Sequence, residues 1–407
     1  MASRHVLHSS AFHLGMHILC TNGTPIVDTL DHLPSIPLFI DYRDTPATIT
    51  RQDELAIHHA LLLRDRIRHI DLHLPSSILH KFLMLMDEPF SMLEHLSLSS
   101  TTKEDTNVVL LKTFLAPNIR HLTCSASIFQ KHWLLLSTVS LVSLSLMDIR
   151  ASGYFSPRLL VARLQALLLL EDLTIEFSVP VPRPSTEIEL LGTHGTPVTL
   201  PNLKSLRFQG VGAYLECLVA QIRVPLLERL DIMLFNQIAF VLPHLSYLIN
   251  TTEAFKLPTS TVFFGNEDFI ITDHQPYGHF TLRVLCKELD WQIDCAAQIC
   301  SALIPALSGV QRLRLDYDGP MMPTRWINGE IDATTWHELL RSFIGVYELR
   351  ICGAFSQELA RALQADEVGL DQGLLPGLKE IVPRFYEALF DPFIRARQIA
   401  GRPVHLR

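Results

Sequence analysis

The sequence lacks the short motifs that mark common enzyme active sites. It has no phosphate-binding loop, no dinucleotide-binding glycine fingerprint, no His-Glu-x-x-His and no nucleophile elbow. Gly210 and Gly212 have no third glycine after them, and His337-Glu338 has no second histidine four residues beyond the first. We therefore expect a protein that is not an enzyme, with no catalytic residues, no cofactor and no metal site.

A basic excess and a regular cysteine spacing are also missing. The 34 Lys and Arg residues stand against 42 Asp and Glu, and the net charge of −8 argues against a general nucleic-acid-binding protein. The seven cysteines are an odd number, and the close pair Cys295 and Cys300 has no second pair to complete a zinc site. This usage predicts free thiols in a reducing compartment, so we expect an intracellular protein, cytoplasmic or nuclear.

A clean signal-peptide core and a convincing membrane span are absent as well. His8 and His13 interrupt the apolar residues of the N-terminus. The run His132–Ile149 has no charge before Asp148, but its leucines fit the repeat described next. We interpret it as a helix end followed by a buried strand, and we expect no membrane partner.

The sequence instead repeats Leu-x-x-Leu-x-Leu at a steady interval. IRHIDL at Ile67, LEHLSL at Leu93 and IRHLTC at Ile119 begin 26 residues apart. Further copies, with starts 22 to 36 residues apart, begin at Leu141, Leu170, Leu203, Leu227, Thr252, Leu282, Val310, Val346 and Leu378. Those at Thr252, Leu282 and Leu378 are degenerate. An interval of this size indicates a repeat architecture.

Helical segments lie between most copies of the repeat. They are 76–86, 156–168, 212–222, 295–307 and 334–344. Ser156 and Pro157 suit the N-cap and first turn of a helix. A strand, a helix and a strand within about 28 residues require parallel pairing with a right-handed crossover. We therefore predict an α/β fold, a leucine-rich-repeat-like solenoid with a curved parallel sheet and helices on the convex side.

Four segments carry a resemblance to a known family. They are LPSIPLFIDYRDTPATITRQDELAIHHALLLRDRIRHIDLHLP, PVTLPNLKSLRFQGVGAYLECL, PLLERLDIMLFNQ and FDPFIRARQIAGRPVHL. The chain, from about residue 16 to its end, resembles the leucine-rich repeat superfamily and, more closely, the F-box-like leucine-rich repeat proteins of mushroom-forming fungi. The resemblance implies a protein-interaction module similar to the substrate-recognition part of an F-box ubiquitin-ligase receptor.

Two departures from the family pattern affect this expectation. The position that usually holds Asn or Cys after the last leucine is occupied by Pro75, Thr101, Ser127, Ile149, Val211 and Phe235, which predicts nonstandard turns. The nearest F-box candidate, Leu30–Ile40, contains Pro34 and Pro37, which cannot both lie in a helix. We interpret it as a strand ending at Tyr42, and we expect that the adaptor of a ubiquitin ligase does not bind.

The organisation predicted from these segments has three parts. Residues 1–66 form an N-terminal capping leader, with a helix opening near Thr50 in a loose capping box. Residues 67–381 form the repeats, and residues 382–407 form a C-terminal capping helix and tail with Gly401 at the helix end.

Two excursions interrupt the predicted repeats. The segment 178–199 is rich in proline, and the segment 258–278 is polar. An enzyme with an unrecognised site in the loops 178–199 and 258–279 is the alternative to a non-catalytic binding module.

The third and fifth positions of each copy face outward when the leucines face inward. This geometry predicts a binding face made of His69, His95, His121, Arg207, Arg229, Asp231, Arg312, Arg314, Glu348 and Arg350. The alternative is a set of ordinary solvated positions, with the arginines paired to Asp231, Asp316 and Glu348. Because arginine matches carboxylate and phosphate groups, we expect an acidic or phosphorylated protein partner.

The three outward histidines stand at equivalent positions of neighbouring copies. We expect them to form a crowded row that disfavours the charged imidazoles and lowers their pKa values. A structural zinc site generally needs four ligands, so we expect a hydrogen-bonding stripe and not a metal site.

Overall fold

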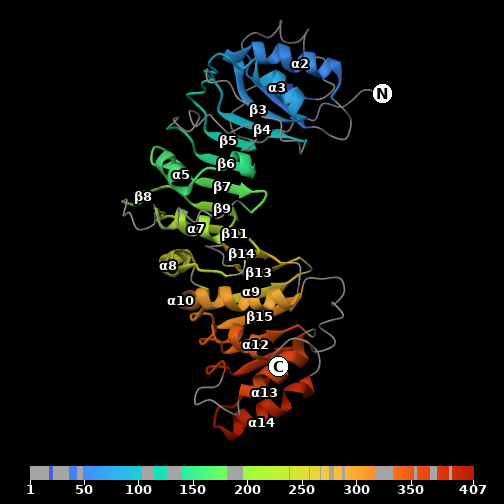
Figure 1. The fold of residues 1–407 in the computed structure, drawn as a ribbon, viewed down its shortest axis with the longest axis vertical. Coiled ribbons are helices and arrows are strands. Elements are labelled where there is room, and N and C mark those ends of the chain that lie inside the picture. Colours follow the sequence, from blue (N-terminus) through green and yellow to red (C-terminus); the bar gives the residue numbers. More distant parts are fainter. Residues whose placement is uncertain are drawn as a thin grey trace. The chain divides into compact units, whose positions relative to one another are not determined.

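The computed structural model describes residues 18–21, 36–43, 49–102, 114–125, 139–180, 196–237, 239–255, 257–265, 267–274, 279–286, 289–317, 333–352, 355–366, 374–384 and 387–407. The chain divides into two compact units, residues 1–141 and residues 142–407, and each is described by itself. Both are mixed α/β structures built on mostly parallel strands (Figure 1).

The first unit is built on parallel strands that pair in chain order. They are β1 (Ile18–Cys20), β2 (Leu38–Arg43), β3 (Ile67–Leu74), β4 (His95–Ser100) and β5 (His121–Ser125). Its described helices are α2 (Arg51–Leu62) and α3 (Ser76–Leu83). The predicted capping box opens α2, since Asp53 N–H donates to Thr50 Oγ1 at 3.1 Å and Thr50 N–H donates back to Asp53 Oδ2 at 3.3 Å.

The second unit is built on one long sheet with an antiparallel insertion. Its strands are β6 (Ser143–Ile149), β7 (Asp172–Phe177), β9 (Ser205–Gly210), β11 (Arg229–Phe235), β12 (Thr259–Phe264), β13 (Asp268–His274), β14 (His279–Leu285), β15 (Arg312–Tyr317), β16 (Glu348–Ile351), β17 (Glu380–Pro383) and β18 (His405–Leu406). Their order is β6-β7-β9-β11-β14-β13-β12-β15-β16-β17-β18, and β13 runs antiparallel to both of its neighbours. A separate parallel pair joins β8 (Val198–Thr199) to β10 (Ile222–Arg223).

The helices of the second unit overlap the predicted helical segments, except those at Pro243–Thr251 and Ser356–Asp366, which were not predicted from the sequence. The helices are α5 (Pro157–Leu164), α7 (Gly212–Val219), α8 (Pro243–Thr251), α9 (Leu289–Ala302), α10 (Ile304–Leu307), α12 (Ala333–Leu340), α13 (Ser356–Asp366) and α14 (Asp391–Ile399). Ser156 caps α5 as predicted, accepting a hydrogen bond from Leu159 N–H at 3.2 Å, with Pro157 in the first turn. After α14 the chain turns at Gly401, whose φ of 74° suits glycine.

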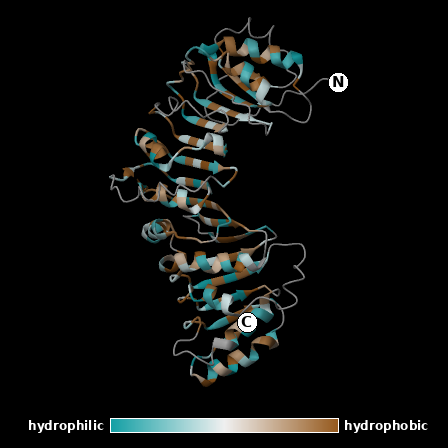
Figure 2. Cartoon of the chain, viewed as in Figure 1, coloured by the Kyte–Doolittle hydropathy of each residue, from teal (hydrophilic) through white to brown (hydrophobic). Residues whose placement is uncertain are grey.

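The strands bury one face and expose the other. In β9, Leu206 and Phe208 are fully buried, whereas Ser205 is partly buried and Arg207 is about half exposed. Hydrophilic and hydrophobic residues accordingly alternate along many strands in Figure 2. Helices supply the cover for the buried face. The ring centroids of Tyr214 in α7 and Phe177 in β7 are 4.8 Å apart, and those of Trp336 in α12 and Phe264 in β12 are 6.0 Å apart.

The leucines predicted to face the core are buried in both units. They are Leu96, Leu98, Leu144, Leu146, Leu206, Leu230, Leu313 and Leu349. The prediction of inward leucines is therefore confirmed for these positions.

The region after α8 differs from the prediction. The polar excursion 258–278 mostly forms β12 and β13, so the sheet is not wholly parallel. The copy assigned at Thr252 is wrong, because Glu253–Phe255 forms a 3-10 turn. The copy assigned at Leu282 is out of register, because Phe280, Leu282 and Val284 are the inward residues of β14.

Some predictions fall partly outside the described residues. Most of the excursion 178–199 lies outside the described residues, and so does Leu30–Ser35 of the F-box candidate. The last residues of that candidate, Leu38–Ile40, belong to β2. β2 pairs with β3 across the predicted division at residue 66, and the divisions at 66 and 381 stay predictions. Within the described part of the chain, no helix has the length and apolar character to cross a membrane.

Replacing a buried leucine of β9 tests the assignment of the core face. We expect Leu206→Ala to lower the free energy of unfolding by about 2–5 kcal/mol, because it removes packed methyl groups and leaves a cavity. Leu168→Ala deletes the same atoms at a position that is 55% exposed. We expect this control to stay within about 0.5 kcal/mol of wild type in urea denaturation. Equal losses in the two variants would contradict the assignment.

Candidate binding surface

The predicted histidine row is present in the first unit. In-register pairing aligns His69 of β3 with His95 of β4, and His95 with His121 of β5. The rings of His69 and His95 stack with centroids 4.2 Å apart and planes 13° apart, and those of His95 and His121 lie 5.7 Å apart. Phe39 of β2 stacks on His69 at 5.5 Å, which extends the row by a residue that the repeat pattern did not include.

The middle histidine of this row has a strongly altered pKa. Burial, followed by the neighbouring His69 and His121, lowers the pKa of His95 from its ordinary value of 6.5 to about 4, while Asp71 opposes the shift. The predicted lowering of the pKa is therefore confirmed for His95, with burial as the larger cause and the neighbouring imidazoles as the smaller one. A neutral imidazole at near-neutral pH offers hydrogen bonding and ring stacking, and it adds no positive charge.

In the second unit, the C-terminal arginines surround a buried carboxylate. Glu348 of β16 lies opposite Arg312 of β15 and is only 3% exposed. Its Oε1 lies 2.5 Å from Arg350 Nε, and its Oε2 lies 3.3 Å from Arg312 Nε. Arg312 Nε also donates to the Tyr347 hydroxyl at 2.8 Å. Glu348 was predicted as an outward binding residue; it is instead covered by the two arginines that it holds.

The guanidinium groups around Glu348 remain accessible from outside. The side chains of Arg312 and Arg350 are 54% and 53% exposed. Within the described part of the chain, Arg312 and Arg350 make their side-chain polar contacts through Nε. No ion pair or hydrogen bond with a described residue involves the terminal guanidinium nitrogens of these two arginines. Arg314, at 53% exposure, differs because its terminal nitrogen pairs with Asp316.

The predicted residues nearer the middle of the sheet are also paired in part. Arg207 Nε lies 3.0 Å from Glu176 Oε1 and 3.7 Å from Asp231 Oδ2. Arg229 is exposed and makes no ion pair with the described residues. The pairing alternative is therefore confirmed for Arg207, Arg312, Arg314 and Arg350, although these side chains stay about half exposed.

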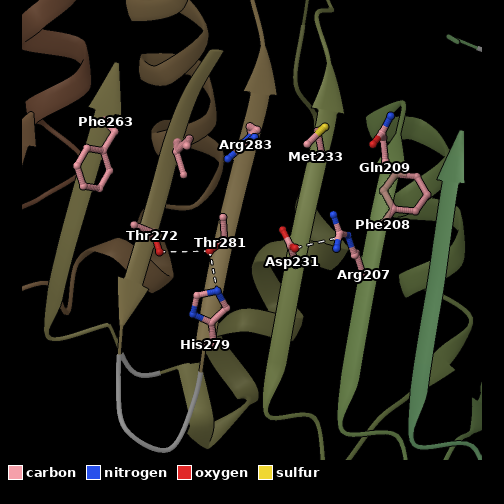
Figure 3. Close-up of a pocket in the computed structure, with 11 residues that line it drawn as sticks. Arg207, Phe208, Gln209, Asp231, Met233, Phe263, Thr272, His279, Thr281 and Arg283 are labelled. Carbon is pink, nitrogen blue, oxygen red and sulfur yellow. Dashed lines mark hydrogen bonds and ion pairs between the residues drawn. The ribbon is translucent and has the colours of Figure 1, made fainter. Parts of the chain in front are cut away.

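A hollow of about 370 Å³ opens on this face of the second unit (Figure 3). It lies over β9, β11, β14, β13 and β12. Its lining residues are Arg207, Phe208, Gln209, Asp231, Met233, Phe263, Ile270, Thr272, His279, Thr281 and Arg283. Arg207 and Asp231 belong to the predicted binding set, and the hollow brings them together with residues that sequence reasoning missed.

Strand register explains which residues share the hollow. Asp231 pairs with Arg207 on one side and with Thr281 on the other, and Thr281 pairs with Thr272. If Phe280, Leu282 and Val284 had been assigned as the inward residues of β14, the alternation along the strand would have identified Thr281 and Arg283 as outward residues. No comparable signal identified Thr272, because the repeat pattern assumes parallel strands and β13 is antiparallel.

A directed hydrogen-bond chain crosses one wall of the hollow. The Thr272 hydroxyl donates to the carbonyl oxygen of Phe280 at 3.1 Å, so its single hydrogen is committed. At the 3.2 Å contact between the two hydroxyls, Thr281 must then be the donor to Thr272. His279 Nε2 lies 3.0 Å from Thr281 Oγ1, and all three contacts are hydrogen bonds at once only when Nε2 is the protonated ring nitrogen and donates to Thr281 (Figure 3).

This direction bears on the catalytic alternative. His279 and Thr281 resemble a base and a nucleophile by distance alone, and His279 lies at the end of the excursion 258–279. A general base must accept the proton of its nucleophile. In the assignment that makes every contact a hydrogen bond, Nε2 carries its own proton and the Thr281 proton goes to Thr272, which is not the arrangement of a base and its nucleophile.

Cysteines and metal ligands do not gather into a second site in the described chain. All seven cysteines are free, and six of them are buried. Burial raises the pKa of Cys20 to about 11 and that of Cys124 to about 12, which disfavours reactive thiolates. Within the described residues, no three His, Cys, Asp or Glu side chains are grouped closely enough to hold a metal ion.

Comparisons with known proteins do not assign this chain to a family. No protein-family model matches the sequence, and no curated protein matches it significantly. The resemblance to F-box-like leucine-rich repeat proteins stays a prediction based on the quoted segments.

The histidine row predicts a pH-dependent stability for the first unit. Because the folded-state pKa of His95 lies below the ordinary value of 6.5, the unfolded chain binds more protons between about pH 6.5 and 4. The contribution is fully present above this window and is lost as the pH falls through it. After allowance for solvent screening, we expect His95→Gln to reduce the stability difference between pH 7.5 and pH 5 by about 1 kcal/mol in urea denaturation.

Ser97→Ala provides the matched control for this measurement. Ser97 is the next outward residue of β4, and its replacement leaves the imidazole row intact. We expect Ser97→Ala to keep the pH dependence of wild type. The explanation is contradicted if His95→Gln also keeps it in full.

Proposed function

We propose that this chain is a non-catalytic protein-interaction module. The exposed sheet face of the second unit recognises an acidic or phosphorylated segment of a protein partner. The observation that supports this best is the arrangement in which Glu348 holds Arg312 and Arg350 by their Nε atoms and leaves the terminal nitrogens unengaged by the described residues.

The charges around Glu348 favour an anionic ligand. Two half-exposed arginine side chains share a single buried carboxylate, so the group of three carries a net charge of +1 in a protein whose net charge is −8. The hydrogen bond to Tyr347, followed by nearby negative charge, raises the pKa of Arg312, which therefore stays protonated. Paired guanidinium ends can bind the oxygens of a carboxylate or a phosphate group through charge-assisted hydrogen bonds.

The neighbouring features are consistent with binding and give little support to catalysis. The outward rows consist of strand positions, and the His279–Thr281 pair has the hydrogen-bond direction of a structural contact. Mostly parallel strands with helices against the buried face also support the finer interpretation that the chain is a leucine-rich-repeat-like solenoid. Solenoids commonly bind partners on the exposed strand face.

The proposed role is similar to that of the substrate-recognition part of an F-box ubiquitin-ligase receptor, separated from the adaptor. The quoted segments support the similarity, and Pro34 and Pro37 support the missing adaptor contact. On this proposal the module is a free binder or a competitor for the partner.

The arginine site can be tested with synthetic peptides before a partner is known. Peptides bearing clustered Asp and Glu, or phosphoserine, are compared with their Asn, Gln and serine counterparts by fluorescence anisotropy. We expect the anionic peptides to bind more tightly and to lose affinity as salt increases. A library in which no anionic peptide binds better than its neutral counterpart would overturn the proposal.

The test variant must avoid leaving Glu348 buried without a partner, because an uncompensated buried charge is strongly destabilising. Arg312→Gln with Glu348→Gln and Arg350→Gln removes the whole group and makes the net charge more negative by one. Arg223→Gln, at an exposed position of β10, makes the same change in net charge. We expect about a tenfold or greater loss of anionic-peptide affinity in the triple variant, with little change in the control.

Adaptor binding is a separate prediction. We expect the purified chain to show no binding to the ubiquitin-ligase adaptor at micromolar concentrations, measured by calorimetry beside an F-box protein as positive control. The reason is the absence of a helical F-box in the sequence and the strand β2 at Leu38–Arg43. Micromolar or tighter binding would refute this expectation.

A further inference from the structure

The hollow over β9 to β12 contains one carboxylate whose hydrogen-bonding capacity is unused by the described residues. Asp231 Oδ2 lies 3.7 Å from Arg207 Nε, which is too long for a hydrogen bond. Arg207 Nε carries a single hydrogen. Glu176 Oε1 lies 3.0 Å from this nitrogen and is therefore closer to it than Asp231 Oδ2 is. The side chain of Asp231 is 36% exposed, so a ligand in the hollow can reach it.

Several other polar groups around the hollow already have partners. Gln209 Nε2 donates to the Phe177 carbonyl oxygen at 3.0 Å, and Arg283 Nε lies 3.4 Å from Asp268 Oδ2. The hydrogen-bond chain uses the Thr281 hydroxyl proton and the His279 Nε2 proton within the wall. Asp231 is therefore the strongest acceptor that the hollow offers to a ligand.

The charge of the hollow and its apolar lining indicate which class of ligand it can bind. Glu176 offsets Arg207, and Asp268 offsets Arg283, so Asp231 adds a negative charge to two pairs that are nearly neutral. Met233, Ile270 and Phe263 line the hollow beside it and are only partly buried. A carboxylate next to aliphatic and aromatic surface suits a cation on an apolar stem, since Lys and Arg bury their stems while the charged end is paired.

We propose that this hollow holds a lysine or arginine side chain of a protein partner, with Asp231 accepting hydrogen bonds from its ammonium or guanidinium group. The stem would lie against Met233, Ile270 and Phe263. This inference rests on the proposed function in that the ligand belongs to a protein partner. It deepens that proposal by requiring a basic residue in a partner whose acidic group binds at Arg312 and Arg350.

Met233 provides a local probe of the hollow. Protein labelled with ¹³C in the methionine methyl groups is titrated with acetyl-Gly-Gly-Lys-Gly-Gly-amide, and the Met233 signal is assigned with Met233→Leu. We expect a saturable shift of that signal. Matched peptides with norleucine or glutamate in place of lysine should produce little shift at the same concentration.

Charge variants give opposite expected changes. Asp231→Asn should weaken lysine-peptide binding about tenfold, since a hydrogen bond to a charged group is lost. Arg229→Gln should strengthen it severalfold, because it removes a positive charge two residues from Asp231 on the same face. Asp172→Asn, at an exposed position of β7, matches the charge change of Asp231→Asn and should leave binding unchanged.

Several outcomes would overturn the proposal. One is an equal shift with the norleucine peptide, which would indicate a purely apolar contact. A second is unchanged binding in Asp231→Asn with an intact amide spectrum. A third is binding of n-butylamine without binding of the lysine peptide, which would assign the hollow to a free amine. Each outcome leaves the anionic-peptide test at Arg312 and Arg350 independent, because the probes carry opposite charges and report on different residues.

Discussion

Register between neighbouring strands decides which side chains meet on the exposed face of each unit. Parallel strands that pair without a shift bring equivalent positions side by side, about 4.8 Å apart. In the first unit this places His69 beside His95 and His121. In the second unit it places Arg312 beside Glu348 and Arg207 beside Asp231. Because helices cover the apolar face, the chemistry available to a ligand lies mainly in these rows.

The antiparallel insertion changes the rows in the second unit. β12, β13 and β14 separate β11 from β15, and they bring Thr281 and Thr272 into the row that continues from Asp231. Threonine side chains are shorter than the arginine and methionine side chains nearby. A row of short side chains between longer ones leaves a depression, which accounts for a hollow at this part of the sheet. The same insertion supplies hydroxyl groups that have partners within the wall, and it leaves Asp231 as the acceptor.

The fold could be predicted from the sequence where local rules and the repeat agree. Leucine spacing identified inward residues such as Leu206 and Leu313, and Ser156-Pro157 identified a helix start. The insertion could not be predicted by the same reasoning, because a repeat of parallel units contains no strand running the other way. TSTVFF of β12 has the residues of a strand but lacks the leucine spacing, so its polar surroundings suggested a loop.

The candidate surface could be predicted to the level of rows and no further. Position in the repeat placed Arg312, Glu348 and Arg350 on one face, but the choice between pairing with one another and binding a ligand depends on side-chain conformation. The structure contains pairing through Nε and exposure at the guanidinium ends, so the two alternatives are compatible. Likewise, the availability of Asp231 follows from the directions of hydrogen bonds, which a sequence does not specify.

Glu348 has more effect on binding geometry than on net stability. Desolvating a carboxylate is costly, and buried ion pairs often contribute little when compared with apolar residues of similar size. Its two oxygens, however, fix arginines from adjacent strands by the side of each guanidinium group. A free arginine side chain loses up to about 2 kcal/mol of conformational entropy when it is immobilised. On the proposed function, folding has already met part of that cost at Arg312 and Arg350, so an anionic ligand encounters two guanidinium ends held in place.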